Sequence, residues 1–279
     1  MEPLLILALV LALWIAVVFA TKRLHLDKRG LDVHPLYIIY RSTRLNNLLF
    51  RMASWNPAFW RVLGDVAVAF AFGQMLFLGW TLITNLLRFF TEPSLAFPVF
   101  LTIPGITVRV QSLPYFLASV SVCVFIHELS HGILCAAEGV PVRNSALVFA
   151  VIFLGGAIEP DEEELKRREA HVKMRIYAIG SLTNLIAGLL TLLIVTSLGE
   201  NFPNPLLSLF EWFNFLSINL AIGNMLPVYP LDGYGVVSNF FDKFGKKGAI
   251  LMRMASFGFL ILMFSNVAMS FAKFGLTSL

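Results

Sequence analysis

Long apolar runs separated by polar segments set the pattern of this chain. A helix needs about 20 predominantly apolar residues to cross the hydrocarbon core of a bilayer. Six runs are long enough, and they cover residues 4–20, 62–87, 114–137, 172–198, 206–228 and 248–271. The first run could be a signal peptide, but no basic residue precedes it and Lys22 and Arg23 follow it, which favours a span whose N-terminus lies outside. The pattern predicts an all-α polytopic membrane protein with about six transmembrane helices.

Two further stretches are apolar but too short to cross. Residues 106–111 alternate apolar and polar side chains, a period of two that predicts a strand at the outer interface. Residues 146–158 contain Gly155 and Gly156 and lead into an acidic run at 159–164. This second stretch predicts a hairpin or re-entrant loop that enters from the cytoplasmic side, with a loosely bounded amphipathic loop as an equal alternative. We expect one integral membrane domain over residues 1–279, with no appended soluble domain.

The composition agrees with a bilayer environment. Hydrophobic residues make up 58% of the chain and charged residues 14%, whereas a soluble domain has about a quarter of charged residues. These values exclude a soluble globular protein, and the high apolar content excludes a disordered one. Cys123 and Cys135 both fall in the third run, where a helix would place them roughly 18 Å apart, so a disulfide framework is excluded as well.

The net charge of +4 reflects how the basic residues are distributed among the loops. Of the 21 Lys and Arg residues, all but Arg88, Arg109 and Lys273 follow the first, third or fifth run. Cytoplasmic loops carry an excess of Lys and Arg, so this distribution predicts that both termini lie outside and that the basic loops face the cytoplasm. The positive charge is therefore explained by topology, and we expect no nucleic-acid partner.

The third run carries two histidines and a glutamate at membrane depth. His127 and His131 are four positions apart, so a helix places both imidazoles on one face, with Glu128 about 100° round the same helix. Ionisable groups are costly to desolvate, and a shared metal ion offsets that cost for both histidines. The spacing is typical of zinc hydrolases, in which the glutamate serves the attacking water. It also occurs by chance in soluble helices, but buried neutral histidines would each need a separate hydrogen-bond partner.

A catalytic zinc ion normally has three protein ligands, so a third must come from elsewhere. Three nearby candidates fit poorly. Cys135 lies a turn beyond the histidine pair, Glu138 lies about 10 Å along the helix axis, and His171 falls in a basic loop. Asp65, in the second run, is a possible ligand or a polar contact between helices.

Asp232 is the better third ligand. It follows Pro227 and Pro230 at the inner end of the fifth run and precedes Gly233, a combination that ends a helix and begins a turn. Because the third and fifth runs both lead inward, the predicted topology brings Asp232 to the cytoplasmic side, where the histidine pair lies. The sequence therefore predicts one buried metal site there.

Taken together, these motifs resemble those of the site-2 protease family of intramembrane zinc metalloproteases, peptidase family M50, most of all its archaeal and prokaryotic members. The resemblance rests on residues 127–131 and 224–233, on Gly180 and Asn184 as a Gly-x-x-x-Asn element, and on the acidic segment 159–165. It covers about residues 114–235, which would form the catalytic core. Residues 1–113 and 236–279 would supply the flanking N-terminal and C-terminal spans.

The resemblance implies three zinc ligands, one general base and two groups at the substrate or the developing oxyanion. In that order they are His127, His131 and Asp232; Glu128; and Asn184 and Asn224. It implies one catalytic Zn²⁺ and a metalloendopeptidase that hydrolyses peptide bonds within or next to transmembrane segments. The implied substrates are single-span membrane proteins such as membrane-tethered transcription factors or anti-sigma factors. The implied location is the cell membrane, as a multi-pass protein whose active site lies toward the cytoplasm.

Three other functions fit parts of the same pattern. A transporter or metal channel could use the histidine pair and Asp65 as pathway residues, but it gives no reason for Glu128 beside His127. A non-catalytic interaction protein with a structural zinc would need a fourth protein ligand. A metalloprotease with a Glu third ligand is disfavoured, because no Glu lies in the fourth run or at the inner end of the fifth.

Overall fold

The computed structural model describes residues 3–24, 31–34, 37–41, 43–100, 102–103, 107–150, 153–198 and 203–275. Its helices are α1 (Pro3–Arg23), α2 (Thr43–Trp55), α3 (Pro57–Thr91), α4 (Leu113–Ala137), α5 (Glu162–Arg167), α6 (Ala170–Leu198), α7 (Asn204–Gly223), α8 (Asp232–Phe241) and α9 (Gly245–Phe274). Its strands are β1 (Leu31–Val33), β2 (Tyr37–Arg41), β3 (Val142–Ala150) and β4 (Phe153–Pro160).

Within the described ranges, five helical segments are long and apolar enough to cross a membrane. They are Pro57–Thr91, Val110–Ala137, Ala170–Leu198, Asn204–Gly223 and Asp232–Phe274, and they contain the second to sixth predicted spans, apart from the last residues of the fifth. The first predicted span is also helical, as the 21-residue α1, but it is outside this group of five. The predicted class, an all-α polytopic membrane protein, is confirmed.

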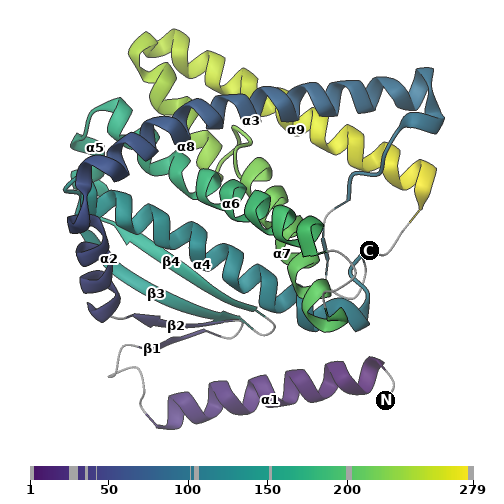
Figure 1. Ribbon diagram of the computed structural model, residues 1–279, viewed down its shortest axis with the longest axis horizontal. Helices are drawn as coiled ribbons and strands as arrows, with labels where there is room; N and C mark the ends of the chain where they lie inside the picture. The colour runs from purple at the N-terminus through teal and green to yellow at the C-terminus, as the bar shows by residue number, and fades with distance from the viewer. Residues whose placement is uncertain are drawn as a thin grey trace.

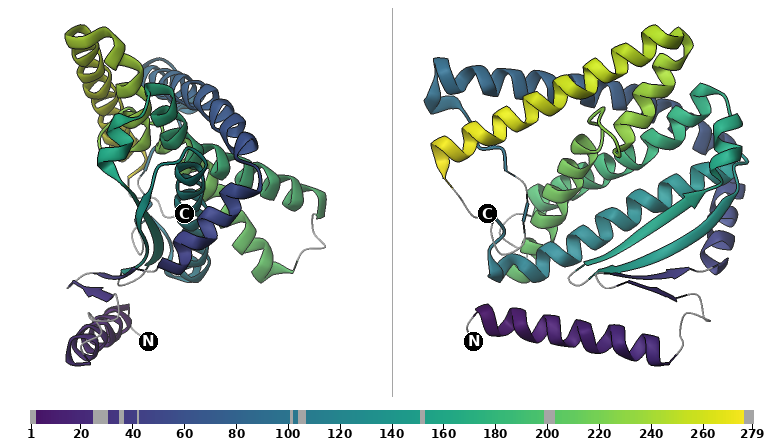
Figure 2. Two further views of the ribbon diagram at one scale, coloured as in Figure 1. Left: turned by 90° about the vertical axis from the view of Figure 1, so that its left-hand side faces the viewer. Right: turned by 180° about the vertical axis from the view of Figure 1, so that it is seen from behind.

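Helices α4, α6 and α7 pack against one another and form the centre of the molecule. Figure 1 shows α3 and α9 crossing on one side of these helices and the sheet lying along α4 on the other, with α1 apart beyond the sheet. Figure 2 shows the same layers from two further directions. Close packing between α6 and α7 depends on Gly188, because a Cβ there would lie 2.7 Å from Cγ1 of Ile218. Small residues that let helix backbones approach are typical of membrane helix interfaces.

The core beside the predicted metal-binding motifs is built from four elements. Leu134 of α4, Ile179 of α6, Met225 in the segment after α7 and Val236 of α8 are each fully buried and belong to one cluster. Interiors are packed as densely as organic crystals, so a cluster like this fixes the relative positions of the elements that contribute to it. The motifs on α4, α6 and α8 are thereby held on a rigid frame.

The four strands form one antiparallel sheet in the order β1-β2-β3-β4, so β4 is an edge strand among the described strands. Strands β3 and β4 pair from Val142↔Pro160 to Ala150↔Phe153, which confirms the predicted hairpin; residues 151–152 lie outside the described residues. Strand β4 packs on α4. A Cβ added at Gly156 would lie 3.4 Å from the Cβ of Glu128, so this glycine sets a close approach of the strand to the helix.

The strand predicted for residues 106–111 is wrong. Of the described residues there, Val110–Ser112 form a short 3₁₀ helix that continues directly into α4. The buried Val108 packs beside Phe116 and Leu216. The alternating pattern had no neighbouring strand to pair with in the described structure, and a 3₁₀ turn is a common start of an α-helix.

The acidic run after the hairpin forms the first turn of α5. Asp161 caps this helix, since its side chain accepts hydrogen bonds from the backbone N–H groups of Glu163 and Glu164. Arg143 also donates a hydrogen bond to Asp161 over 2.9 Å, and this bond, together with the backbone donors, holds the pKa of the Asp161 carboxyl below its usual value. Acidic residues at the N-terminus and Lys166 and Arg167 in the last turn complement the helix dipole.

Candidate metal centre

His127, His131 and Asp232 converge on one point between α4 and α8. The Nε2 atoms of the two histidines are 3.1 Å apart, and Oδ2 of Asp232 lies 2.9 Å from Nε2 of His127 and 3.1 Å from Nε2 of His131. Among the described residues, this is the group of three or more His, Cys, Asp or Glu side chains close enough to share a metal ion. The structure thus brings together the three ligands predicted from residues far apart in the sequence.

The interruption of the helix after α7 positions Asp232. Helix α7 ends at Gly223, and the following segment turns back so that the N–H of Gly233 donates to the carbonyl of Asn224 over 2.9 Å. A Cβ at Gly233 would collide with the backbone of Met225 and Leu226, so the tight return requires glycine. Helix α8 then begins at Asp232, which places its carboxylate beside the histidines.

Helix α6 forms the other wall of the centre. The Nδ1 atom of His131 donates to the carbonyl of Ile176 over 2.5 Å, which leaves the Nε2 lone pair free to bind a cation. Gly180 provides the space for both rings, because a Cβ there would lie 2.5 Å from Nε2 of His131 and 2.6 Å from Cε1 of His127. The amide of Asn184 lies 3.3 Å from Nδ1 of His127.

These residues fit a zinc ion. Two imidazoles and a carboxylate are a usual donor set for catalytic zinc, which leaves a further position open. Ligand atoms arranged tetrahedrally around zinc are about 3.3 Å apart, close to the 2.9 to 3.1 Å that separates these three. The space beside Gly180 that a Cβ would fill is occupied by the two rings that supply the donors.

The predicted base, Glu128, and the second predicted asparagine, Asn224, lie in the region of the three predicted ligands. Oε2 of Glu128 accepts a hydrogen bond from the backbone N–H of Ile158 in β4 over 3.1 Å. Nδ2 of Asn224 donates to Oδ2 of Asp232 over 2.6 Å and lies 2.9 Å from Nε2 of His127. Asn224 therefore lies at the edge of the ligand group, and Glu128 lines a cavity together with His131 and Asp232.

Known proteins share this region of the chain. Residues 115–207 match the model of peptidase family M50. This third of the chain is therefore similar to peptidase family M50. A 148-residue stretch is 26% identical to a protein of Arabidopsis thaliana named "Membrane-bound transcription factor site-2 protease homolog". That stretch covers 52% of this chain and 28% of the plant protein, so the chain spans little more than a quarter of the relative's length.

The candidate metal centre opens into a cavity of about 220 Å³. Glu128, His131 and Asp232 line it, together with the side chains of Cys135, Ile158, Leu165, Ile176 and Tyr177. A second cavity of about 540 Å³ shares Ile158, Leu165 and Tyr177 with the first and continues to charged residues of α5 and α6. The two cavities are therefore adjacent, and the second one extends to the charged segment around α5.

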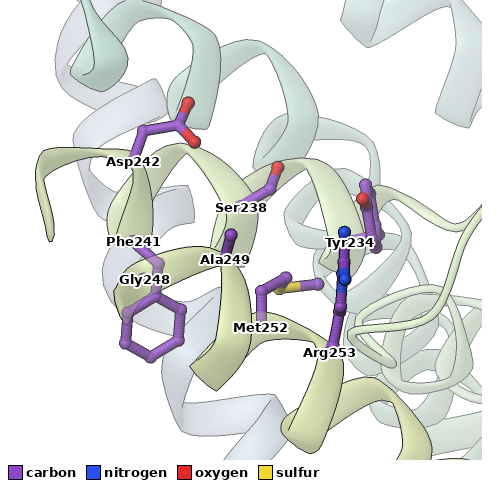
Figure 3. Close-up of a pocket in the computed structure, with 8 residues that line it drawn as sticks. All are labelled: Tyr234, Ser238, Phe241, Asp242, Gly248, Ala249, Met252 and Arg253. Atoms are coloured by element: carbon purple, nitrogen blue, oxygen red, sulfur yellow. The ribbon is translucent and has the colours of Figure 1, made fainter. Parts of the chain in front are cut away.

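A third cavity, of about 170 Å³, lies between α8 and α9. Figure 3 shows its lining, with the polar groups of Ser238, Asp242 and Arg253 around a floor that includes Met252. None of the predicted site residues lines it. This cavity is therefore separate from the candidate metal centre.

The other candidate ligands have different partners. Asp65 receives two hydrogen bonds from Arg175, over 2.6 and 2.7 Å, and Arg175 also donates to Glu138 over 2.9 Å. His171 is exposed and pairs with Glu169. Asp65 is thus the polar contact between helices that the sequence left open, and the transporter alternative loses its acidic pathway residue.

Sequence reasoning missed the backbone groups of the site. The carbonyl of Ile176 and the N–H of Ile158 hold His131 and Glu128. Backbone groups are present at every position, so their use at a site leaves no compositional signal. The hydrogen bond of 2.8 Å between the hydroxyls of Ser130 and Thr183, which links α4 to α6, was also missed, although both residues lie inside the recognised motifs.

Proposed function

We propose that this chain is an intramembrane zinc metalloprotease of the site-2 type, which hydrolyses peptide bonds within or next to transmembrane segments of membrane proteins. The observation that carries the proposal is the convergence of His127, His131 and Asp232 beside Glu128 on helices that are long and apolar enough to span a bilayer. The two histidines and Asp232 would hold the metal. A zinc ion held there would act as a Lewis acid that activates water for attack on a carbonyl.

Glu128 is the general base and then the general acid in this proposal. Its carboxylate is adjacent to the ligand group, lines the same cavity, and is held by the N–H of Ile158. It takes a proton from the attacking water and delivers the proton to the leaving amine nitrogen, a transfer that contributes typically 10²- to 10⁴-fold to the rate. Asn224, whose amide lies at the edge of the ligand group, donates a hydrogen bond to the oxygen of the reacting carbonyl as negative charge develops on it.

The substrate has to be extended before it can react. In a helix the carbonyl is already hydrogen-bonded and shielded, so a transmembrane substrate must unwind locally. Strand β4 is an edge of the described sheet and packs on α4 next to Glu128, which supports binding of an extended substrate by strand addition. Water reaches the carbonyl through the two connected cavities, whose outer part is lined by Glu162, Lys166 and Lys173.

The substrate class follows from the membrane location of the site and from the plant relative. That relative is named for a membrane-bound transcription factor protease. Single-span membrane proteins, including membrane-tethered transcription factors or anti-sigma factors, are the proposed substrates here, with the cell membrane as the location.

Cleavage of a tagged single-span protein, co-expressed with the peptidase, tests the catalytic proposal. Glu128→Gln should lower the cleavage rate at least 100-fold while the zinc content per protein stays that of the wild type. Glu163→Gln, the same chemical change on an exposed side chain of α5, is the matched control and should cleave normally. Equal cleavage by Glu128→Gln would refute the assignment of the base.

The ligand assignment has its own measurement. Asp232→Ala should lower the zinc bound per protein after dialysis against a weak chelator, because it removes one of three ligands. Asp242→Ala, a change of the same type at the end of α8, should not. Unchanged zinc content in Asp232→Ala would exclude Asp232 as a ligand.

A further inference from the structure

Asn184 of α6 lies behind one of the metal-ligating rings. Its side chain is fully buried, and its Nδ2 atom lies 3.3 Å from Nδ1 of His127. Among the described residues, its Oδ1 atom has no hydrogen-bond partner. Asn184 is absent from the lining of the cavity that contains Glu128 and Asp232. The amide of Asn184 therefore contacts Nδ1 of His127, the ring nitrogen that faces away from the ligand group.

The proton on His127 decides whether the ring can bind a metal. A neutral imidazole carries its proton on one nitrogen and a lone pair on the other. When Nδ2 of Asn184 donates to Nδ1, the ring proton is on Nε2, which lies between Asp232 and His131. A metal ligand needs the opposite arrangement, with the lone pair on Nε2 and the proton on Nδ1.

A half-turn of the Asn184 amide supplies that arrangement. This rotation places Oδ1 of Asn184 where Nδ2 now lies. Nδ1–H of His127 then donates a hydrogen bond to Oδ1, and Nε2 carries the lone pair. The turn replaces the amide's hydrogen bond to Nδ1 and breaks no other among the described residues. The oxygen without a partner is thus the acceptor that a zinc-binding His127 requires.

His131 already uses the same device. Its Nδ1–H donates to the carbonyl of Ile176, also on α6. The hydroxyls of Ser130 and Thr183, 2.8 Å apart, link α4 to α6 between these two contacts. One helix thereby faces the outer nitrogen of both histidines.

We propose that Asn184 is a positioning residue whose amide oxygen accepts the Nδ1–H of His127 and so holds the Nε2 lone pair toward the zinc ion. This inference rests on the proposed function. It replaces the implied contact of Asn184 with substrate by a contact with His127, since the side chain is buried behind the ring. Partners that orient ligating histidines typically change metal affinity 10- to 100-fold when removed.

Zinc affinity, measured in detergent by competition with a chromophoric chelator, tests the role. Asn184→Leu, which has no acceptor, should bind zinc about 10- to 100-fold more weakly. Asn184→Asp, which keeps an oxygen at the same place, should stay within about threefold of the wild type. Asn184→Ala, which is smaller, provides a second acceptor-free variant if the leucine disturbs folding. Asn214→Leu is the matched control. It removes a hydrogen bond from a side-chain amide of α7 to the carbonyl of Gly188 on α6, and this bond involves no histidine.

A spectroscopic signature separates orientation from general packing. In zinc-loaded wild-type protein labelled with ¹⁵N-histidine, His127 should show a protonated Nδ1 and a metal-bound Nε2, and Asn184→Leu should lose this pattern. Equal zinc affinity in Asn184→Leu and wild type would overturn the inference, as would equal weakening in Asn184→Leu and Asn184→Asp. Wild-type protein that binds zinc but cleaves no substrate would refute the proposed function and leave this inference standing.

Discussion

Replacing Gly180 with alanine would put a methyl group where the two histidine rings lie. The new Cβ would be 2.5 Å from Nε2 of His131, 2.6 Å from Cε1 of His127 and 2.7 Å from Nδ1 of His127. Ordinary van der Waals contact begins at 3.4 Å, so Nε2 of His131 would have to move by about 0.9 Å to relieve the contact. The rings cannot keep their present positions.

That displacement is large on the scale of metal coordination. Ligand distances in working sites stay within about 0.2 Å of their ideal values. A misplacement of about 1 Å costs roughly 100-fold in catalysis. Gly180→Ala should therefore weaken zinc binding by about 100-fold, or about 2.8 kcal/mol, and lower cleavage at least as much. Alanine also favours the helix over glycine by about 0.5–1 kcal/mol, so the stability of the fold will not report the damage.

Two glycine variants in the same protein serve as controls. Gly188→Ala also places a Cβ on α6 in close contact, 2.7 Å from Cγ1 of Ile218, but at the α7 interface. Gly73→Ala meets nothing within 4 Å. Both should bind zinc as the wild type does in the chelator competition assay. If Gly180→Ala bound zinc with wild-type affinity while remaining folded, the inference that this glycine makes room for the ligands would be refuted.

Three further predictions concern the frame around the site. Asp65→Asn should leave the zinc content unchanged and lower the free energy of unfolding by less than about 1 kcal/mol, because the Asp65 side chain is 57% exposed in its pair with Arg175; a loss of zinc in this variant would restore Asp65 as a ligand. Asn266→Leu removes the 3.0 Å hydrogen bond that Asn85 of α3 donates to Asn266 of α9. This variant should lower the free energy of unfolding, measured by thermal unfolding, by about 1 kcal/mol and leave cleavage intact. Because the pKa of Asp161 is lowered, the stability that this carboxylate adds by capping α5 is complete above the ordinary pKa of aspartate and is lost as the pH falls through the lowered pKa. The rate of hydrogen exchange in α5 should rise over that acidic range. The same rise in an Asp161→Asn variant would contradict the assignment to Asp161.

The membrane spans could be predicted because they depend on composition over some 20 residues. The His127–His131 pair could be predicted because both residues lie on one helix, where a spacing of four fixes a shared face. Asp232 lies about 100 residues later, and it was placed beside them by topology and by the helix break at Pro227 and Pro230. In each case the decisive information was local or was carried by the orientation of whole helices.

What could not be predicted depends on partners distant in the sequence. Strand β2 (Tyr37–Arg41) pairs with β3 about 110 residues later, and nothing within β2 names that partner. The partner of Asp65 could not be predicted either, because its carboxylate suits a metal ion or an arginine equally well. The packing of α3 on α6 places Arg175 beside it. The pattern at residues 106–111 failed for the converse reason, because an alternating sequence becomes a strand when another strand lies beside it.

Glu128 is anchored by a backbone N–H group, that of Ile158, rather than by another side chain. An alanine scan along β4 would leave this bond in place at each position, and proline at 158 is the substitution that would remove it. The side chains of the hairpin that border the cavity are free to change without moving the carboxylate. Under the proposed function, point mutations in the sheet would therefore change the preference for substrate sequence, while the carboxylate beside it stays where it is.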